Sequence, residues 1–79
     1  MTVRITERTL AGIGRIYEIP LESNLTLIVA LLDRGGCELS LRRPGAERAC
    51  ASAGLDRDET LALVAVLTGA KFSIRRDGE

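Results

Sequence analysis

The 79-residue sequence predicts an α+β fold: a small, mostly antiparallel sheet of four to five strands with one helix packed on it. Three observations support this prediction. Several short segments alternate apolar and polar residues, the pattern of half-buried strands. Glycine-containing turns separate these segments, and one segment near the C-terminus carries helix-capping residues. At this length we expect a single domain, residues 1–79.

Two glycines divide the first pair of predicted strands. Val3 to Arg8 alternates and predicts a half-buried strand, and Arg15 to Leu21 predicts a second one. Gly12 and Gly14 lie between them, and glycine reaches backbone angles that a Cβ forbids. We therefore predict a structural turn at these glycines. A phosphate-binding loop is disfavoured, because the third glycine is missing and a strand follows where such loops have a helix.

The middle of the chain predicts a β-hairpin. Leu25 to Leu32 is apolar on both faces, which is typical of a central strand covered on both sides. Asp33 to Gly36 contains two glycines that can supply the positive φ of a tight turn. Cys37 to Arg42 then alternates cleanly, so the two segments are expected to pair.

A loop and a helix are expected after this hairpin. Arg43 to Gly54 is rich in Pro, Gly and Ala and predicts a loop, with a short edge strand within Glu47 to Ala53. Asp56 is a suitable N-cap and Glu59 completes a capping box, so a helix should begin there. Gly69 is a natural end for this helix.

The predicted helix is apolar around almost its whole circumference, which indicates burial from more than one side. A domain of this size cannot cover both this helix and the second face of the Leu25–Leu32 strand. We therefore predict a subunit interface, and expect a homodimer. The residues predicted for this interface are Leu61, Val64, Leu67, Ile28 and Leu32. Lys71 to Arg75 could form a short last strand.

The composition excludes most catalytic and metal chemistry. The chain has no histidine, which removes the commonest general base and the commonest zinc ligand. Cys37 and Cys50 have no nearby base, so we expect reduced thiols that act as buried small apolar residues. No signal-peptide core or membrane-length apolar run is found, which predicts a soluble cytoplasmic protein. We expect no enzyme activity, no cofactor and no metal site.

A second functional class stays open at this point. Arg42, Arg43 and Arg48 surround the loop after the hairpin and could contact phosphates as a small nucleic-acid-binding or transcription-associated module. The overall charge gives little support, because 11 basic residues balance 11 acidic ones. Solvated arginines near the ends of the sheet are the simpler interpretation, and nucleic acid is not the expected partner.

The segment Leu10 to Ile19 resembles the N-terminal domain of bacterial cation/proton antiporter regulatory subunits, whose string is of the type Leu-Pro-Gly-Val-Gly-Lys-Lys-Tyr-Glu-Ile. Ile13 and Arg15 are conservative changes, Ala11 stands at the family's proline, and Ile16 replaces a basic residue. The outright matches are Gly12, Gly14, Tyr17, Glu18 and Ile19. The apolar strand, the hairpin and the capped helix follow in the family's order.

This resemblance implies a non-enzymatic regulatory domain of a potassium/proton antiporter subunit. Such subunits are soluble partners of membrane exchangers and carry a second, TrkA-C-like domain that senses ligands. We expect residues 69–79 to form a tail or linker towards that second domain. The implied partners are a membrane antiporter subunit and the ligand-sensing domain, and the implied location is the cytoplasm at the inner face of the membrane.

Overall fold

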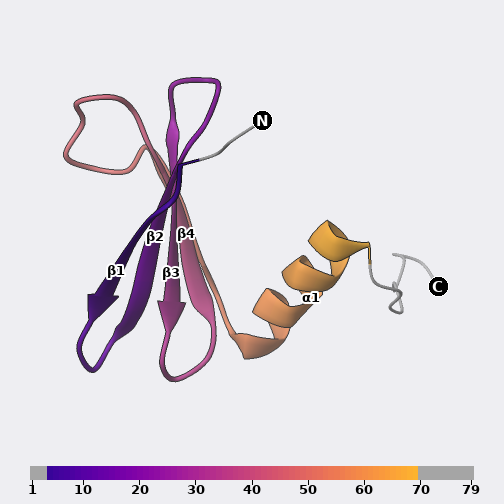
Figure 1. The fold of residues 1–79 in the computed structure, drawn as a ribbon. Helices are drawn as coiled ribbons and strands as arrows, with labels where there is room; N and C mark the ends of the chain where they lie inside the picture. Colours follow the sequence, from indigo (N-terminus) through magenta and orange to yellow (C-terminus); the bar gives the residue numbers. More distant parts are fainter. Residues whose placement is uncertain (1–3, 70–79) are drawn as a thin grey trace.

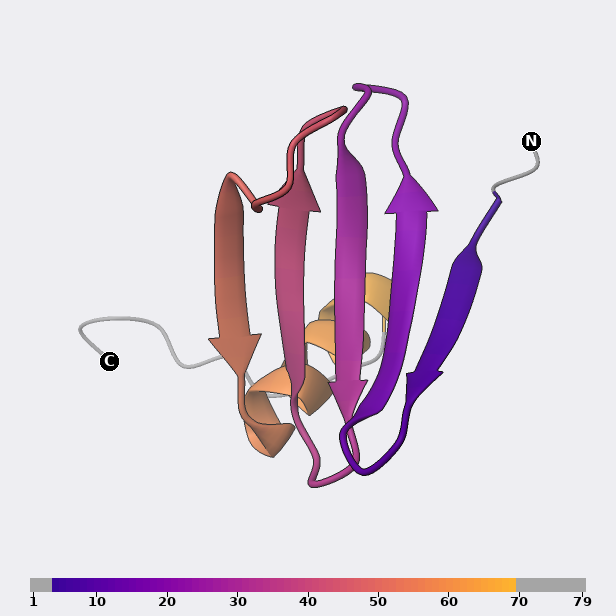
Figure 2. The ribbon, with the colours of Figure 1, turned by 90° about the vertical axis from the view of Figure 1, so that its left-hand side faces the viewer.

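The structure, a computed structural model, describes residues 4–69 as a five-stranded antiparallel sheet followed by one helix (Figures 1 and 2). The strands lie in the sheet in chain order, β1-β2-β3-β4-β5. The predicted α+β class is confirmed. The elements are β1 Thr6–Leu10, β2 Gly14–Pro20, β3 Thr26–Leu32, β4 Cys37–Arg42, β5 Ala51–Leu55 and α1 Arg57–Thr68.

The first strand is shifted from its predicted position. β1 begins at Thr6, which lies opposite Glu18 of β2. Continuing this register would bring Arg4 opposite Pro20, which has no amide hydrogen to donate to a ladder. The pairing therefore ends at Thr6, although the alternating pattern in the sequence begins earlier.

The central hairpin is confirmed, with β3 and β4 paired from Thr26 opposite Arg42 to Leu31 opposite Cys37. The edge strand exists too, but it lies later in the chain than predicted. β5 starts at Ala51 and continues to Leu55, which lies opposite Cys37. The predicted last strand, Lys71 to Arg75, lies outside the described residues.

The turn between β1 and β2 contains both predicted glycines. Gly12 has a φ of 76° and lies in open space, and the Ile13 amide donates to the Leu10 carbonyl at 3.0 Å. Gly14 is buried, and a Cβ added to it would lie 1.9 Å from the backbone oxygen of Leu31. Gly14 is therefore required for the close approach of β2 to β3.

Helix α1 begins and ends as its capping residues predict. The Asp56 carboxylate accepts a hydrogen bond from the Glu59 amide at 2.8 Å. The Glu59 carboxylate in turn accepts from the Asp56 amide at 2.9 Å, which completes the capping box. Gly69 ends the helix in the left-handed conformation, with φ 74°.

The helix contacts the sheet through its first turn, at β5 and Cys37 (Figure 1). Thr60 Oγ1 lies 3.5 Å from Sγ of Cys37, and Cys37 is 3% exposed. Leu67 is 75% exposed, because the helix diverges from the sheet beyond its first turn. One residue, Asp56, joins β5 to α1, so the helix begins directly after the strand. Among residues 4–69, Cys37 is the one residue with an apolar side chain that is buried; Gly14 is buried as well.

Candidate protein–protein interface

The two faces of the sheet differ in chemistry. Side chains of cross-strand partners point to the same face, so the register assigns every strand residue to one face. We call the face towards α1 the apolar face; on β2 to β5 its apolar residues are Tyr17, Ile19, Leu27, Val29, Leu31, Cys37, Leu39, Leu41, Ala51, Ala53 and Leu55. The same register places Glu7, Thr9 and Arg15 on this face, towards the β1 edge. We call the other the mixed face; its residues include Arg8, Ile16, Glu18, Ile28, Leu32, Ser40, Arg42 and Ser52.

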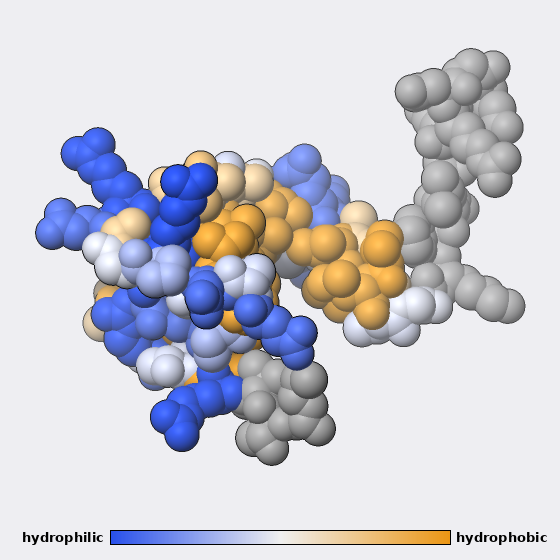
Figure 3. All heavy atoms as spheres, turned by 90° about the horizontal axis from the view of Figure 1, so that it is seen from above, coloured by the Kyte–Doolittle hydropathy of each residue, from blue (hydrophilic) through white to orange (hydrophobic). Residues whose placement is uncertain are grey.

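Most of the apolar face is left in contact with solvent. The first turn of α1 covers Cys37, but Leu31, the residue opposite Cys37 on the next strand, is 42% exposed. Figure 3 shows hydrophobic side chains on the sheet side towards α1 and over the helix, with hydrophilic side chains on the far side of the sheet. Contiguous exposed apolar surface makes this face a candidate interaction surface.

The helix residues predicted for an interface are all exposed. Leu61 is 58% exposed, Val64 is 50% exposed, and Leu67 is the most exposed of the three. No charged residue follows Glu59 within the helix, so its last two turns present neutral, mainly aliphatic side chains. Figure 1 shows that α1 diverges from the sheet after its first turn.

The two strand residues predicted for the interface lie elsewhere. Ile28 and Leu32 are half-buried on the mixed face, away from α1. Leu27 and Val29, which were not predicted as interface residues, lie on the apolar face instead. Their exposure depends on the path of α1, which depends on the length of the connection after β5.

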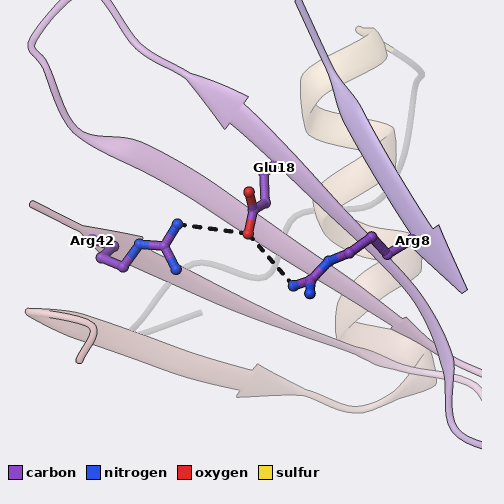
Figure 4. A network of polar contacts seen from close by, with 3 residues as sticks. All are labelled: Arg8, Glu18 and Arg42. Atoms are coloured by element: carbon purple, nitrogen blue, oxygen red, sulfur yellow. Dashed lines mark ion pairs between the residues drawn. The ribbon is translucent and has the colours of Figure 1, made fainter. Parts of the chain in front are cut away.

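The mixed face carries an ion-pair cluster at its centre (Figure 4). Glu18 on β2 lies 3.6 Å from the guanidinium of Arg8 on β1 and 3.6 Å from that of Arg42 on β4. The Glu18 carboxylate thus pairs with one arginine from β1 and one from β4, which lie on opposite sides of β2 in the sheet. The Arg8 side chain is 60% exposed, so solvent screens the pair with Glu18.

The other predicted basic residues are not gathered with Arg42. Arg43 and Arg48 are exposed in the loop between β4 and β5, whereas Arg42 is half-buried beside Glu18. Cys50, in the same loop, is exposed and reduced, so the prediction of a buried thiol was wrong there and right for Cys37. Cys50 precedes β5, and this loop has no second layer above it to bury a side chain.

Neither a metal site nor a membrane span is found in the part of the chain that the structure describes. Residues 4–69 hold no group of three or more histidine, cysteine, aspartate or glutamate side chains placed to bind a metal ion. Over the same residues, no helix is both long enough and apolar enough to span a membrane. The surfaces described above are therefore the candidate functional sites.

A comparison with curated proteins found no match. A family model, described as the N-terminal domain of the K⁺/H⁺ antiporter subunit KhtT, matches residues 3–71. This range includes the whole sheet and α1, so it covers both candidate surfaces. The chain therefore belongs to the family of KhtT N-terminal domains of K⁺/H⁺ antiporter subunits.

Proposed function

We propose that this chain is a non-enzymatic regulatory domain of a K⁺/H⁺ antiporter subunit, and that it acts by dimerising and by contacting the membrane transporter or a ligand-sensing domain. The observation that supports this most directly is the apolar surface that residues 4–69 leave uncovered on the apolar face and α1. A domain of an antiporter subunit needs surfaces for its partners rather than a catalytic cleft. Exposed apolar surface at these positions fits that need.

The two faces suit two kinds of partner. Interfaces between copies of a permanent homodimer are more apolar than the rest of a protein surface, so we assign homodimerisation to the apolar face and α1. The mixed face, with Ile28, Leu32 and the Glu18 cluster, then stays available for the transporter or the sensing domain. In this arrangement the domain works at the inner face of the membrane, held there by its transporter partner.

Light scattering coupled to size exclusion tests the dimer. We expect twice the chain mass for the unchanged chain, and the chain mass for the double variant Leu61→Asp, Leu67→Asp, because buried carboxylates are costly without partners. Ile13→Asp is the matched control. Ile13 is 56% exposed, close to the 58% of Leu61, but it lies at the turn between β1 and β2. A monomeric unchanged chain at high micromolar concentration would contradict the proposal.

Transport measurements test the regulatory part. A proton gradient is formed across everted membrane vesicles that contain the antiporter. The K⁺-dependent loss of that gradient is then followed in the presence and in the absence of the intact subunit that includes this chain. We expect the rate to respond to the intact subunit, and the response to be lost in Ile28→Asp. An unchanged rate in both cases would count against a regulatory role.

The nucleic-acid alternative receives less support. Arg42 already faces Glu18, and residues 43–50 form a loop rather than a basic stripe on one element. Binding to single-stranded and duplex oligonucleotides at low salt separates the two functions. Salt-sensitive binding that disappears when Arg42, Arg43 and Arg48 are all replaced by alanine would favour the alternative.

A further inference from the structure

An apolar trough lies on the apolar face, at the end of the sheet opposite the first turn of α1. It has a volume of about 280 Å³ and a lining that is almost entirely apolar. The small side chains of Ala51 and Ala53 on β5 leave space beside the larger Leu39 and Leu41 on β4, and Leu27 closes the far side. A trough between small and large residues can take a ridge of aliphatic side chains.

The chain's own helix does not fill this trough. It contacts the sheet at β5, next to Cys37, and no residue of α1 lines the trough. Figure 1 shows α1 diverging from the sheet after this contact. A single residue, Asp56, separates β5 from α1, so the connection between them is short.

We propose that α1 of a second copy occupies the trough, so that two chains exchange helices across a two-fold axis. The proposal rests on the dimer proposed above and adds its geometry: two apolar faces directed inwards, with both helices between them. Each copy gives one helix and receives one, which closes the assembly as a two-fold interface requires. The residues expected to enter the trough are Leu61, Val64 and Leu67.

Two properties favour a second copy over other occupants. The first is self-complementarity: residues 4–69 hold both this apolar trough and, on α1, the exposed aliphatic side chains of Leu61, Val64 and Leu67. The second is charge: neither the last two turns of α1 nor the trough lining contains a charged residue. Neutral apolar surfaces complement each other and offer no counter-charge to a nucleic acid or an anionic lipid.

Disulfide formation between two different variants tests the exchange. Both chains carry Cys50→Ser to remove the exposed thiol. One chain also carries Val64→Cys, and the other, with a mass tag, carries Ala53→Cys. After co-expression and mild oxidation, we expect a cross-linked species whose mass is the sum of the two chains.

Ser52→Cys in place of Ala53→Cys is the matched control. Ser52 is the neighbouring residue on β5 but points to the mixed face, so we expect at least tenfold less mixed cross-link. If light scattering shows a dimer but positions 52 and 53 cross-link equally, the helix exchange is overturned and the dimer is not. A monomer in light scattering would overturn the dimer itself.

A single chain that carries both Val64→Cys and Ala53→Cys tests the competing geometry. Helix exchange predicts cross-linked dimers on a denaturing, non-reducing gel. If the helix instead folds down onto its own sheet, the disulfide forms within one chain and the product is an oxidised monomer. A product dominated by oxidised monomer would overturn the proposal.

Discussion

The apolar and mixed faces of this sheet are formed by the same strands, yet they present different chemistry. On the apolar face, β3 and β4 place aliphatic side chains such as Val29 and Leu39 opposite each other. On the mixed face, Glu18 lies between Arg8 and Arg42 and pairs with both. The charged side chains of this cluster therefore have partners within the chain, whereas α1 covers the apolar face only at its first turn.

Adjacent residues of β4 give the strongest test of this difference. Leu39 points to the apolar face and Ser40 to the mixed face, and both are half-buried. We expect Leu39→Asp to raise the dimer dissociation constant about a thousandfold, which corresponds to ~4 kcal/mol, because the interface would bury an unpaired carboxylate. Ser40→Asp should leave it within about threefold. Sedimentation equilibrium measures both constants, and equal effects at the two positions would remove the distinction between the faces.

A second test separates assembly from the stability of the sheet. Gly14→Ala adds a Cβ at 1.9 Å from the Leu31 oxygen, so β2 and β3 must move apart. We expect the free energy of unfolding to fall by ~3 kcal/mol, in the range of overpacked and strained sites. Gly54→Ala is the control, because a Cβ there meets nothing within 4 Å and the φ of Gly54 is not positive.

Urea denaturation at a fixed protein concentration measures this difference. Gly54→Ala should stay within about 0.5 kcal/mol of the unchanged chain, as is usual for surface substitutions. Equal stability of the Gly14→Ala and Gly54→Ala variants would show that the close approach at Gly14 is not required. Neither variant changes a side chain of the apolar face, so the folded fraction of each variant should still dimerise.

Local sequence signals predicted the elements of this fold and their order. The glycines around β2, the alternation of β4 and the capping box at Asp56 each act over a few residues, and each appears in the structure where such a signal places it. The start of β1 was predicted too early, because it depends on which residue lies opposite Pro20. That register is a property of two strands together and not of either segment alone.

The open surface was harder to predict, for a related reason. The exposure of Leu61 and Leu67 followed from a helix with more apolar surface than one sheet can cover. The exposure of the apolar face did not follow, because it depends on the angle at which α1 leaves β5. The single-residue connection at Asp56 sets that angle, and hydrophobic periodicity carries no information about it.

The smallest effect is expected on the mixed face, at its ion-pair cluster. Glu18→Gln keeps the size of the side chain but removes its charge, so Arg8 and Arg42 lose their shared partner. We expect the free energy of unfolding to fall by less than ~1 kcal/mol, because both pairs are 3.6 Å long and open to solvent. Urea denaturation at low and high salt should show this difference shrinking as salt increases. A loss of dimer in Glu18→Gln would mean that the mixed face also takes part in assembly, since no side chain of the apolar face has changed. A stable dimer would leave the two faces with separate roles, one for a second copy and one for a different partner.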